Sequence, residues 1–127
     1  MKKIIKTKEA PEAIGPYNQA VTANGFLFTA GQIGINPSSG LLVEGGVEKE
    51  IVRVMQNLDA ILDSEGIDKT YITKLTVYVT DLSDFTIVNN AFENYFAGTD
   101  YPARSTVEVS ALPLGALVEV DCIAFLF

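Results

Sequence analysis

The chain of 127 residues contains no histidine and a single cysteine, Cys122. Without histidine there can be no Ser-His or Cys-His nucleophile pair and no histidine-ligated zinc site. One cysteine can form neither an internal disulfide nor a thiolate metal cage, and its apolar neighbours predict an inert core thiol. Any catalysis must therefore use carboxylates, Tyr, Lys, Arg, hydroxyl groups or backbone groups, and we expect no metal.

Positive charge and long apolar runs are also scarce. Nine Lys and Arg residues face 16 Asp and Glu residues, which gives a net charge of −7. Binding to a nucleic-acid backbone relies on clustered basic residues, so this balance argues against a nucleic-acid partner. No apolar run approaches the roughly 20 residues that cross a bilayer, and the first residues do not resemble a secretory signal. We therefore expect a cytoplasmic protein with no membrane partner, folded as one domain over residues 1–127.

Alternating or apolar runs of β-prone residues predict the strands. The stretch "AVTANGFLFTAGQI" (20–33) predicts a hairpin, because Asn24-Gly25 is the preferred pair for a tight type I′ turn. A loop rich in turn formers, "NPSSG" (36–40), follows. Further strands are predicted over 74–82, 104–111 and 118–126, and the pattern also allows a short strand at 4–5.

Two amphipathic segments predict helices. Residues 47–65 place their apolar side chains on one narrow stripe, and Gly66 suits a helix C-terminal cap. Asp84 is a suitable N-cap for a second helix, whose buried face is predicted to carry Phe85, Val88, Phe92, Tyr95 and Phe96. The resulting order, β-β-α-β-α-β-β, predicts an α+β fold with one sheet and two helices on one face. The last strand is apolar on both faces, which favours a homo-oligomer with the open sheet faces packed together.

A few polar residues are candidates for chemistry. Arg104 begins a strand in an acidic chain, and arginine grips carboxylates or phosphates with two parallel hydrogen bonds, although a surface ion pair is the alternative. Glu119 and Asp121 share one face of the last strand, and they either serve a site or form the wet face of that strand. Asn89 lies within the apolar stripe of the second helix, where satisfying backbone groups is the alternative. Tyr17 follows a Gly-Pro turn and is either a site residue or a packing residue.

The motifs "AIGPYNQAV" (13–21), "TAGQIGINPSSG" (29–40), "QNLDAIL" (56–62), "VYVTDLSDFTIVN" (77–89) and "YPARSTVEVSALPLGALVEVDCIA" (101–124) resemble the RidA (YjgF) family of reactive-intermediate deaminases. The resemblance covers nearly the whole chain. It implies a chorismate-mutase-like fold and a homotrimer with clefts between subunits. It also implies hydrolysis of 2-imino and 2-enamino acids, such as 2-iminobutanoate and 2-iminopropanoate, to 2-keto acids and ammonia. No cofactor is implied, and pyridoxal-phosphate-dependent dehydratases are the implied source of the substrate.

The resemblance also assigns site residues. The family's carboxylate-binding arginine falls on Arg104, and its glutamate near the reacting carbon falls on Glu119. The pocket tyrosine falls on Tyr17, the helix asparagine on Asn89, and a backbone position that lines the pocket on Gly31.

Two positions depart from many relatives in this family. Thr106 stands where several carry cysteine, and Ala30 stands where several carry serine. The absent serine hydroxyl bears on substrate range rather than on the class of reaction.

These roles suit the chemistry of an imino acid. A two-pronged arginine would fix the substrate carboxylate beside the electrophilic carbon, and Glu119 would take the proton of the attacking water. Two other functions remain open: a non-catalytic module that binds keto acids, and a ribonuclease, which the acidic charge opposes.

One geometric difficulty arises from the predicted strands. If the strands over 104–111 and 118–126 formed a plain hairpin, Arg104 would lie roughly 20 Å from Glu119. Either these strands are not neighbours in the sheet, or the two residues reach one pocket from different subunits.

Overall fold

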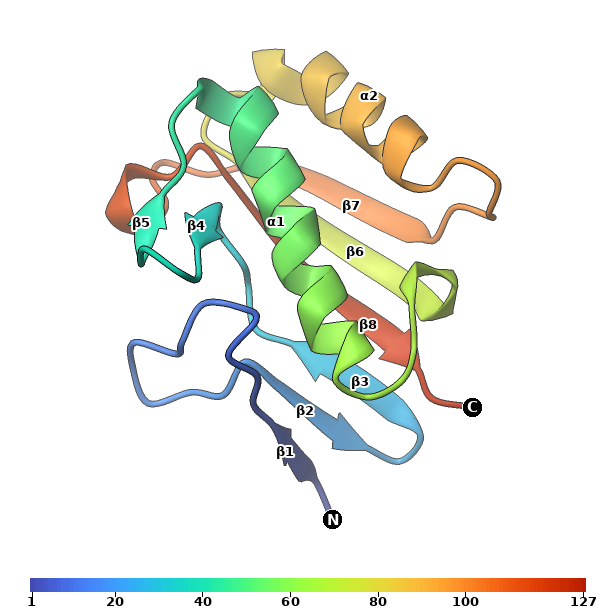
Figure 1. The fold of residues 1–127 in the computed structure, drawn as a ribbon. Coiled ribbons are helices and arrows are strands. Elements are labelled where there is room, and N and C mark those ends of the chain that lie inside the picture. Colours follow the sequence, from blue (N-terminus) through green and yellow to red (C-terminus); the bar gives the residue numbers. More distant parts are fainter.

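The computed structural model describes all residues, 1–127, as a six-stranded sheet with helices on one face and a small separate pair of strands (Figure 1). The six-stranded sheet has the order β1-β2-β3-β8-β6-β7. Its strands are β1 (Lys3–Ile5), β2 (Ala20–Ala23), β3 (Phe26–Thr29), β6 (Ile72–Val79), β7 (Ala103–Glu108) and β8 (Val118–Phe125). A separate pair, β4 (Ile35–Asn36) and β5 (Leu41–Leu42), brackets the predicted 36–40 loop and had no clear sequence signal.

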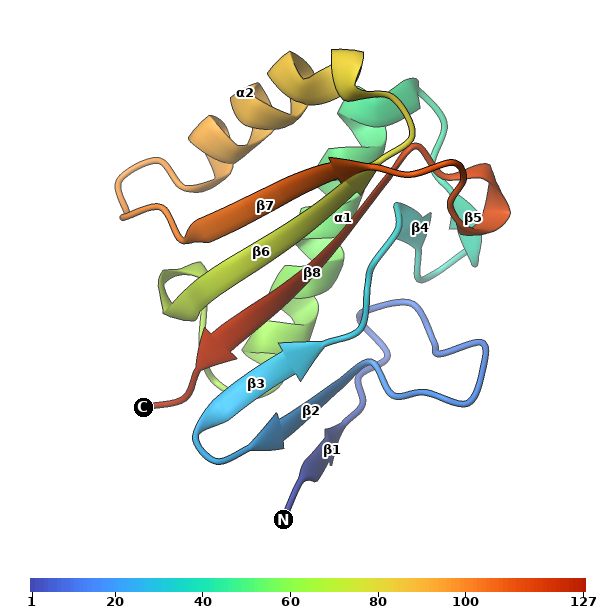
Figure 2. The same ribbon diagram turned by 180° about the vertical axis from the view of Figure 1, so that it is seen from behind.

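The helices α1 (Gly46–Asp63) and α2 (Phe85–Tyr95) both lie on one face of the sheet, and the view from behind shows the other face uncovered (Figures 1 and 2). The predicted α+β arrangement is therefore confirmed. The whole apolar stripe of α1 is buried: Val47, Ile51, Val54, Leu58, Ile61 and Leu62. It packs with the helix-facing residues of β6 and β8 in a single core, which stabilises the fold by removing apolar surface from water.

The turns at Asn24-Gly25 and at Gly66 have the conformations that the sequence predicts. Asn24 and Gly25 both take positive φ, at 53° and 84°, as a type I′ hairpin between β2 and β3 requires. Gly66 follows α1 with a φ of 71° and donates its N–H to the carbonyl of Asp63. Asp84 does precede α2, but its side chain caps nothing. A short 3₁₀ turn, Leu82–Asp84, precedes α2, so the helical segment begins earlier than predicted. Asp81 caps this turn, and its side chain accepts from the N–H of Ser83.

Strands β7 and β8 do not pair with each other, so the expectation that they form a plain hairpin is wrong. Strand β6 lies between them, parallel to β7 and antiparallel to β8. The segment that joins them contains a further 3₁₀ turn, Pro113–Gly115, and crosses over the end of β6 instead of reversing directly. The parallel pairing follows from α2, which crosses between β6 and β7 as in a βαβ unit.

The uncovered face of the sheet carries large apolar side chains beside carboxylates. Phe26, Phe28 and Phe125 are each about two-fifths exposed there, and Val107 is similarly exposed near the opposite edge. Glu119 and Asp121 point to the same face from β8. No helix has both the length and the apolar character to cross a membrane.

Candidate functional site

Arg104 lies at the start of β7, beneath α2. Its guanidinium Nη2 donates to Oδ1 of Asn89 at 2.7 Å, and its central carbon lies 5.3 Å and 5.4 Å from the ring centroids of Phe85 and Phe92. No carboxylate lies within ion-pair distance, so the surface ion-pair reading of this arginine is wrong within the chain. Sequence reasoning placed Phe85 on the buried face, but its ring is exposed and forms one wall beside the guanidinium. The arginine is thus held in place while its charge stays unneutralised.

A small pocket opens beside this guanidinium. It has a volume of about 240 Å³ and lies between α2 and β7. Its lining residues are Leu75, Asn89, Phe92, Glu93, Phe96, Tyr101, Pro102 and Arg104. Thr106 lies two residues along β7 on the same face, and its hydroxyl oxygen is buried without a hydrogen-bond partner. Such unsatisfied buried groups are uncommon. This end of the sheet therefore places the guanidinium of Arg104 and the unpaired hydroxyl of Thr106 on one face, next to apolar side chains.

Glu119 lies on β8 with its carboxylate directly over Gly31. A Cβ at Gly31 would lie only 2.3 Å from Oε2 of Glu119, so no side chain fits there while the carboxylate keeps this position. Burial raises the pKa of the Glu119 carboxyl, and the neighbouring negative charge of Asp121 raises it further. A carboxylate with a raised pKa is a better proton acceptor than an ordinary one.

The other carboxylate of this face, Asp121, has its own partners. The hydroxyl of Tyr78 donates to Oδ2 of Asp121 at 3.2 Å. Burial raises the pKa of Asp121, and the Tyr78 hydrogen bond and the charge of Lys74 oppose that shift. Lys74 in turn donates to the hydroxyl of Ser105 at 3.0 Å. Sequence reasoning missed Tyr78, although its alternation with Val77 and Val79 placed it on the face away from the helices.

Arg104 and Glu119 project from opposite faces of the sheet. Arg104 pairs with Leu75 of β6, whose side chain is buried under the helices. Glu119 pairs with Tyr78, three residues along the same strand and therefore on the other face. One chain consequently does not bring the two side chains to one ligand.

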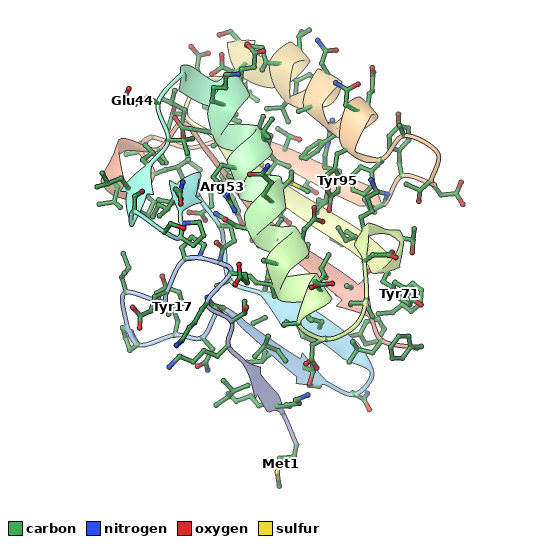
Figure 3. The ribbon with its side chains drawn as sticks, in the orientation of Figure 1. Met1, Tyr17, Glu44, Arg53, Tyr71 and Tyr95 are labelled. Atoms are coloured by element: carbon green, nitrogen blue, oxygen red, sulfur yellow. The ribbon has the colours of Figure 1, made fainter.

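Tyr17 lies on the long loop between β1 and β2, away from β7 (Figure 3). It is 48% exposed, its ring packs against Gly15, and its hydroxyl accepts from the N–H of Ile14 at 3.4 Å. The loop is anchored by Gln19, whose buried side-chain amide donates to three backbone carbonyls and accepts from the N–H of Thr7. The N–H of Ala30 donates to the carbonyl of Gln19, which ties this loop to the segment with Gly31.

The lone thiol is remote from this chemistry. Cys122 is buried among core residues, and burial raises its pKa to about 12. The predicted inert core thiol is confirmed, since a thiol with this pKa holds almost no thiolate near neutral pH. No three Cys, Asp or Glu residues gather in a way that could hold a metal ion.

Known proteins resemble this chain over almost its whole length. The profile of the family described as Endoribonuclease L-PSP matches residues 7–126. The chain belongs to this family. A crystal structure from Yersinia pestis, described as a protein of unknown function of the conserved Rid protein family, superposes with a TM-score of 0.97. It is 51% identical and covers 99% of this chain and 100% of its own.

Two curated relatives carry different descriptions. A RutC family protein of Aquifex aeolicus is 48% identical over 94% of this chain and 96% of its own length. The 2-iminobutanoate/2-iminopropanoate deaminase of Mus musculus is 44% identical over 98% of this chain and 91% of its own length. The RidA resemblance and the chorismate-mutase-like fold predicted from the sequence are confirmed. The name of one relative specifies a substrate and the name of the other does not.

Proposed function

We propose that this protein hydrolyses 2-imino and 2-enamino acids to 2-keto acids and ammonia. The observation that carries the proposal is the state of Arg104. It is held by Asn89, flanked by two phenylalanine rings, free of any acidic partner and open to a small pocket. A cation prepared in this way suits a substrate carboxylate, because none of the protein's own carboxylates must be displaced first.

The net charge of the chain supports a local anchor for the substrate. At a charge of −7 the protein repels an anion at long range, and physiological salt screens such forces beyond about 8 Å. Steering by the overall field therefore cannot concentrate an imino acid. The substrate carboxylate must be bound by a fixed cation at short range. Arg104 is such a cation, because it extends from β7 and is held by Asn89 of α2.

The chemistry requires one proton acceptor besides the anchor. A water molecule adds to the imine carbon, and the C–N bond then breaks to leave the keto acid and ammonia. Glu119 takes one proton from the water and gives it to the nitrogen, which forms a carbinolamine. It then takes the hydroxyl proton of the carbinolamine and gives it to the departing nitrogen, so that ammonia leaves and Glu119 ends ionised again. Its half-buried carboxylate and its raised pKa support this role. An imine is already electrophilic, and orientation with one base is sufficient without histidine or metal.

The complete site is proposed to form between subunits of a homotrimer. Arg104, Asn89 and Thr106 come from one chain, and Glu119, Gly31 and Tyr17 come from its neighbour. The support is the position of Arg104 and Glu119 on opposite faces of one sheet, together with the exposed phenylalanines on the face that carries Glu119. Packing of open sheet faces would bury those rings and bring the second group of residues to the edge of a neighbour's pocket.

A coupled assay tests this function. A serine or threonine dehydratase generates the imino acid in place, and its absorbance is followed with and without this protein. Faster decay with release of ammonia is expected. Tight binding of the keto acid product without faster decay would instead identify a non-catalytic binding module.

A further inference from the structure

Two polar side chains interrupt the apolar stripe of α1. Glu50 is only 3% exposed and Asn57 is fully buried, and both lie on the side of the helix that faces the sheet. They are seven residues apart, which is two helical turns, so they lie on the same side of α1. Buried polar groups are costly unless they are hydrogen-bonded, and the proposed chemistry uses neither residue. Their partners indicate what they do.

Glu50 binds the backbone at the start of β8. Its Oε1 accepts from the N–H of Leu117 at 2.8 Å. Burial raises the pKa of Glu50, and the amides of Leu117 and Val118 oppose that shift. The carbonyl of Leu117 accepts from the N–H of Thr80, so both backbone polar groups of Leu117 are hydrogen-bonded. Glu119 is only two residues further along the chain, and its backbone position follows from this attachment.

Asn57 binds the other chain segment of the site. Its side-chain amide donates to the carbonyls of Ile33 and Ile35 at 3.2 Å and 3.0 Å. Its Oδ1 accepts from Nε of Arg53, labelled in Figure 3, at 3.0 Å. Both amide hydrogens and one of the two lone pairs of the amide oxygen are thereby used. Gly31 lies just before this segment.

The two segments meet where the site is built. Gln32 and Val120 exchange N–H to carbonyl bonds at 2.8 Å and 3.0 Å, which places Gly31 beside Glu119. Gly34 lies directly against α1, since a Cβ there would come within 3.0 Å of the Cα of Glu50. Helix α1 therefore lies against the segment that contains Gly34. Its side chains bind both this segment, through Asn57, and the start of β8, through Glu50.

We propose that Glu50 and Asn57 are positioning residues, which hold the backbones of Gly31 and Glu119 at the spacing that seats the Glu119 carboxylate. This inference rests on the proposed function for its kinetic consequence. Neither residue touches substrate. The bridge between Gln32 and Val120 is isolated, because Gln32 lies outside any strand, so backbone pairing alone secures this spacing weakly. The bonds from α1 supply the missing restraint.

The kinetic test uses Asn57→Ala, Glu50→Ala and Glu50→Gln, with Ser64→Ala as the matched control. The hydroxyl of Ser64 also donates to a backbone carbonyl, that of Ile61, but this carbonyl belongs to the last turn of α1 itself. Loss of positioning should lower kcat about fivefold or more while KM stays within about twofold, because Arg104 is unaffected. Glu50→Gln keeps one acceptor and should recover part of what Glu50→Ala loses. All variants are assayed well below their melting temperatures, and only those with a native circular dichroism spectrum are compared.

A second measurement separates this inference from the proposed function. The carbon resonance of the Glu119 carboxyl and the amide resonance of Gly31 are followed by NMR in the same proteins. Both should move in Asn57→Ala and Glu50→Ala, move less in Glu50→Gln, and stay in place in Ser64→Ala. If the unaltered protein hydrolyses no imino acid, the proposed function fails while these shifts still decide the positioning role. If folded variants keep both resonances unmoved, the inference is overturned, whether or not kcat has changed.

Discussion

Arg104 and Glu119 project from opposite faces of the same sheet, one under α2 and the other onto the open face. If both act on one ligand, they must come from different chains. Mixed oligomers of Arg104→Ala and Glu119→Ala subunits should therefore regain activity, although each variant is inactive alone. The measurement is turnover after the two proteins are unfolded together and refolded. Absence of activity from oligomers verified by mass to be mixed would contradict a shared site.

Replacement of Arg104 by lysine should reduce turnover on the order of tenfold or more, consistent with about 1.5–3 kcal/mol for a charged hydrogen bond. Lysine keeps the charge but loses the planar fork, which binds Asn89 and which we propose also binds the substrate carboxylate. Loss of imine absorbance measures the rate, and circular dichroism checks the fold. Lys69→Arg serves as a control that should leave the rate unchanged, because Lys69 contacts Tyr95 and does not line the pocket beside Arg104. Normal turnover in Arg104→Lys would remove the anchoring role.

Gly31→Ala should reduce activity without unfolding the protein. The added Cβ would lie 2.3 Å from Oε2 of Glu119, so the carboxylate must move to a new rotamer. Gly40→Ala is the control for a glycine substitution in open space, and only its backbone strain should be felt. Thermal melting and kcat are measured for both. Unchanged kcat in Gly31→Ala would mean that this seat of Glu119 is not needed.

Glu119→Gln should bind a keto acid while hydrolysis slows, because glutamine keeps the shape but is a poor proton acceptor. Calorimetric titration with 2-oxobutanoate and the coupled assay give the two quantities. A variant that binds poorly but turns over normally at saturation would make Glu119 a binding residue, with the base elsewhere.

The acidic limb of the pH–rate profile, where the rate falls as the pH is lowered, should lie above the usual pKa of a glutamate. Burial first, and the charge of Asp121 second, raise the pKa of Glu119. The ionised base is therefore lost at a higher pH as the solution is acidified. Asp121→Asn removes one of the two causes and should move this limb to lower pH, whereas Glu48→Gln on the solvent side of α1 should not. A limb that stays in place in Asp121→Asn would show that another group limits the rate.

The protein should be a trimer at micromolar concentration, by light scattering. Phe28→Asp places a charge on the open face and should lower the mass, while Val52→Asp on the exposed side of α1 should not. A monomer mass for the unaltered protein would count against a site between subunits.

Local chemistry was enough to predict most elements of the fold. The apolar stripe of α1, the Asn24-Gly25 turn and the alternation in β6 and β8 act between residues near in sequence, and each was confirmed. The parity of β8 also placed Glu119 and Asp121 together on one face. The residues that resemble family site positions were visible because the motifs around them are contiguous in the chain.

Only the tertiary structure decided which strands are neighbours and which side chains meet. The insertion of β6 between β7 and β8 depends on where α2 packs, and no local pattern in either strand records it. Asn89 was found on the apolar stripe, but its bond to Arg104 spans 15 residues. Glu50 and Asn57 were hidden among apolar neighbours, since their partners lie 67 and 24 residues away. Such contacts are set by how whole elements pack, because a buried polar group takes whichever partner the fold brings within reach.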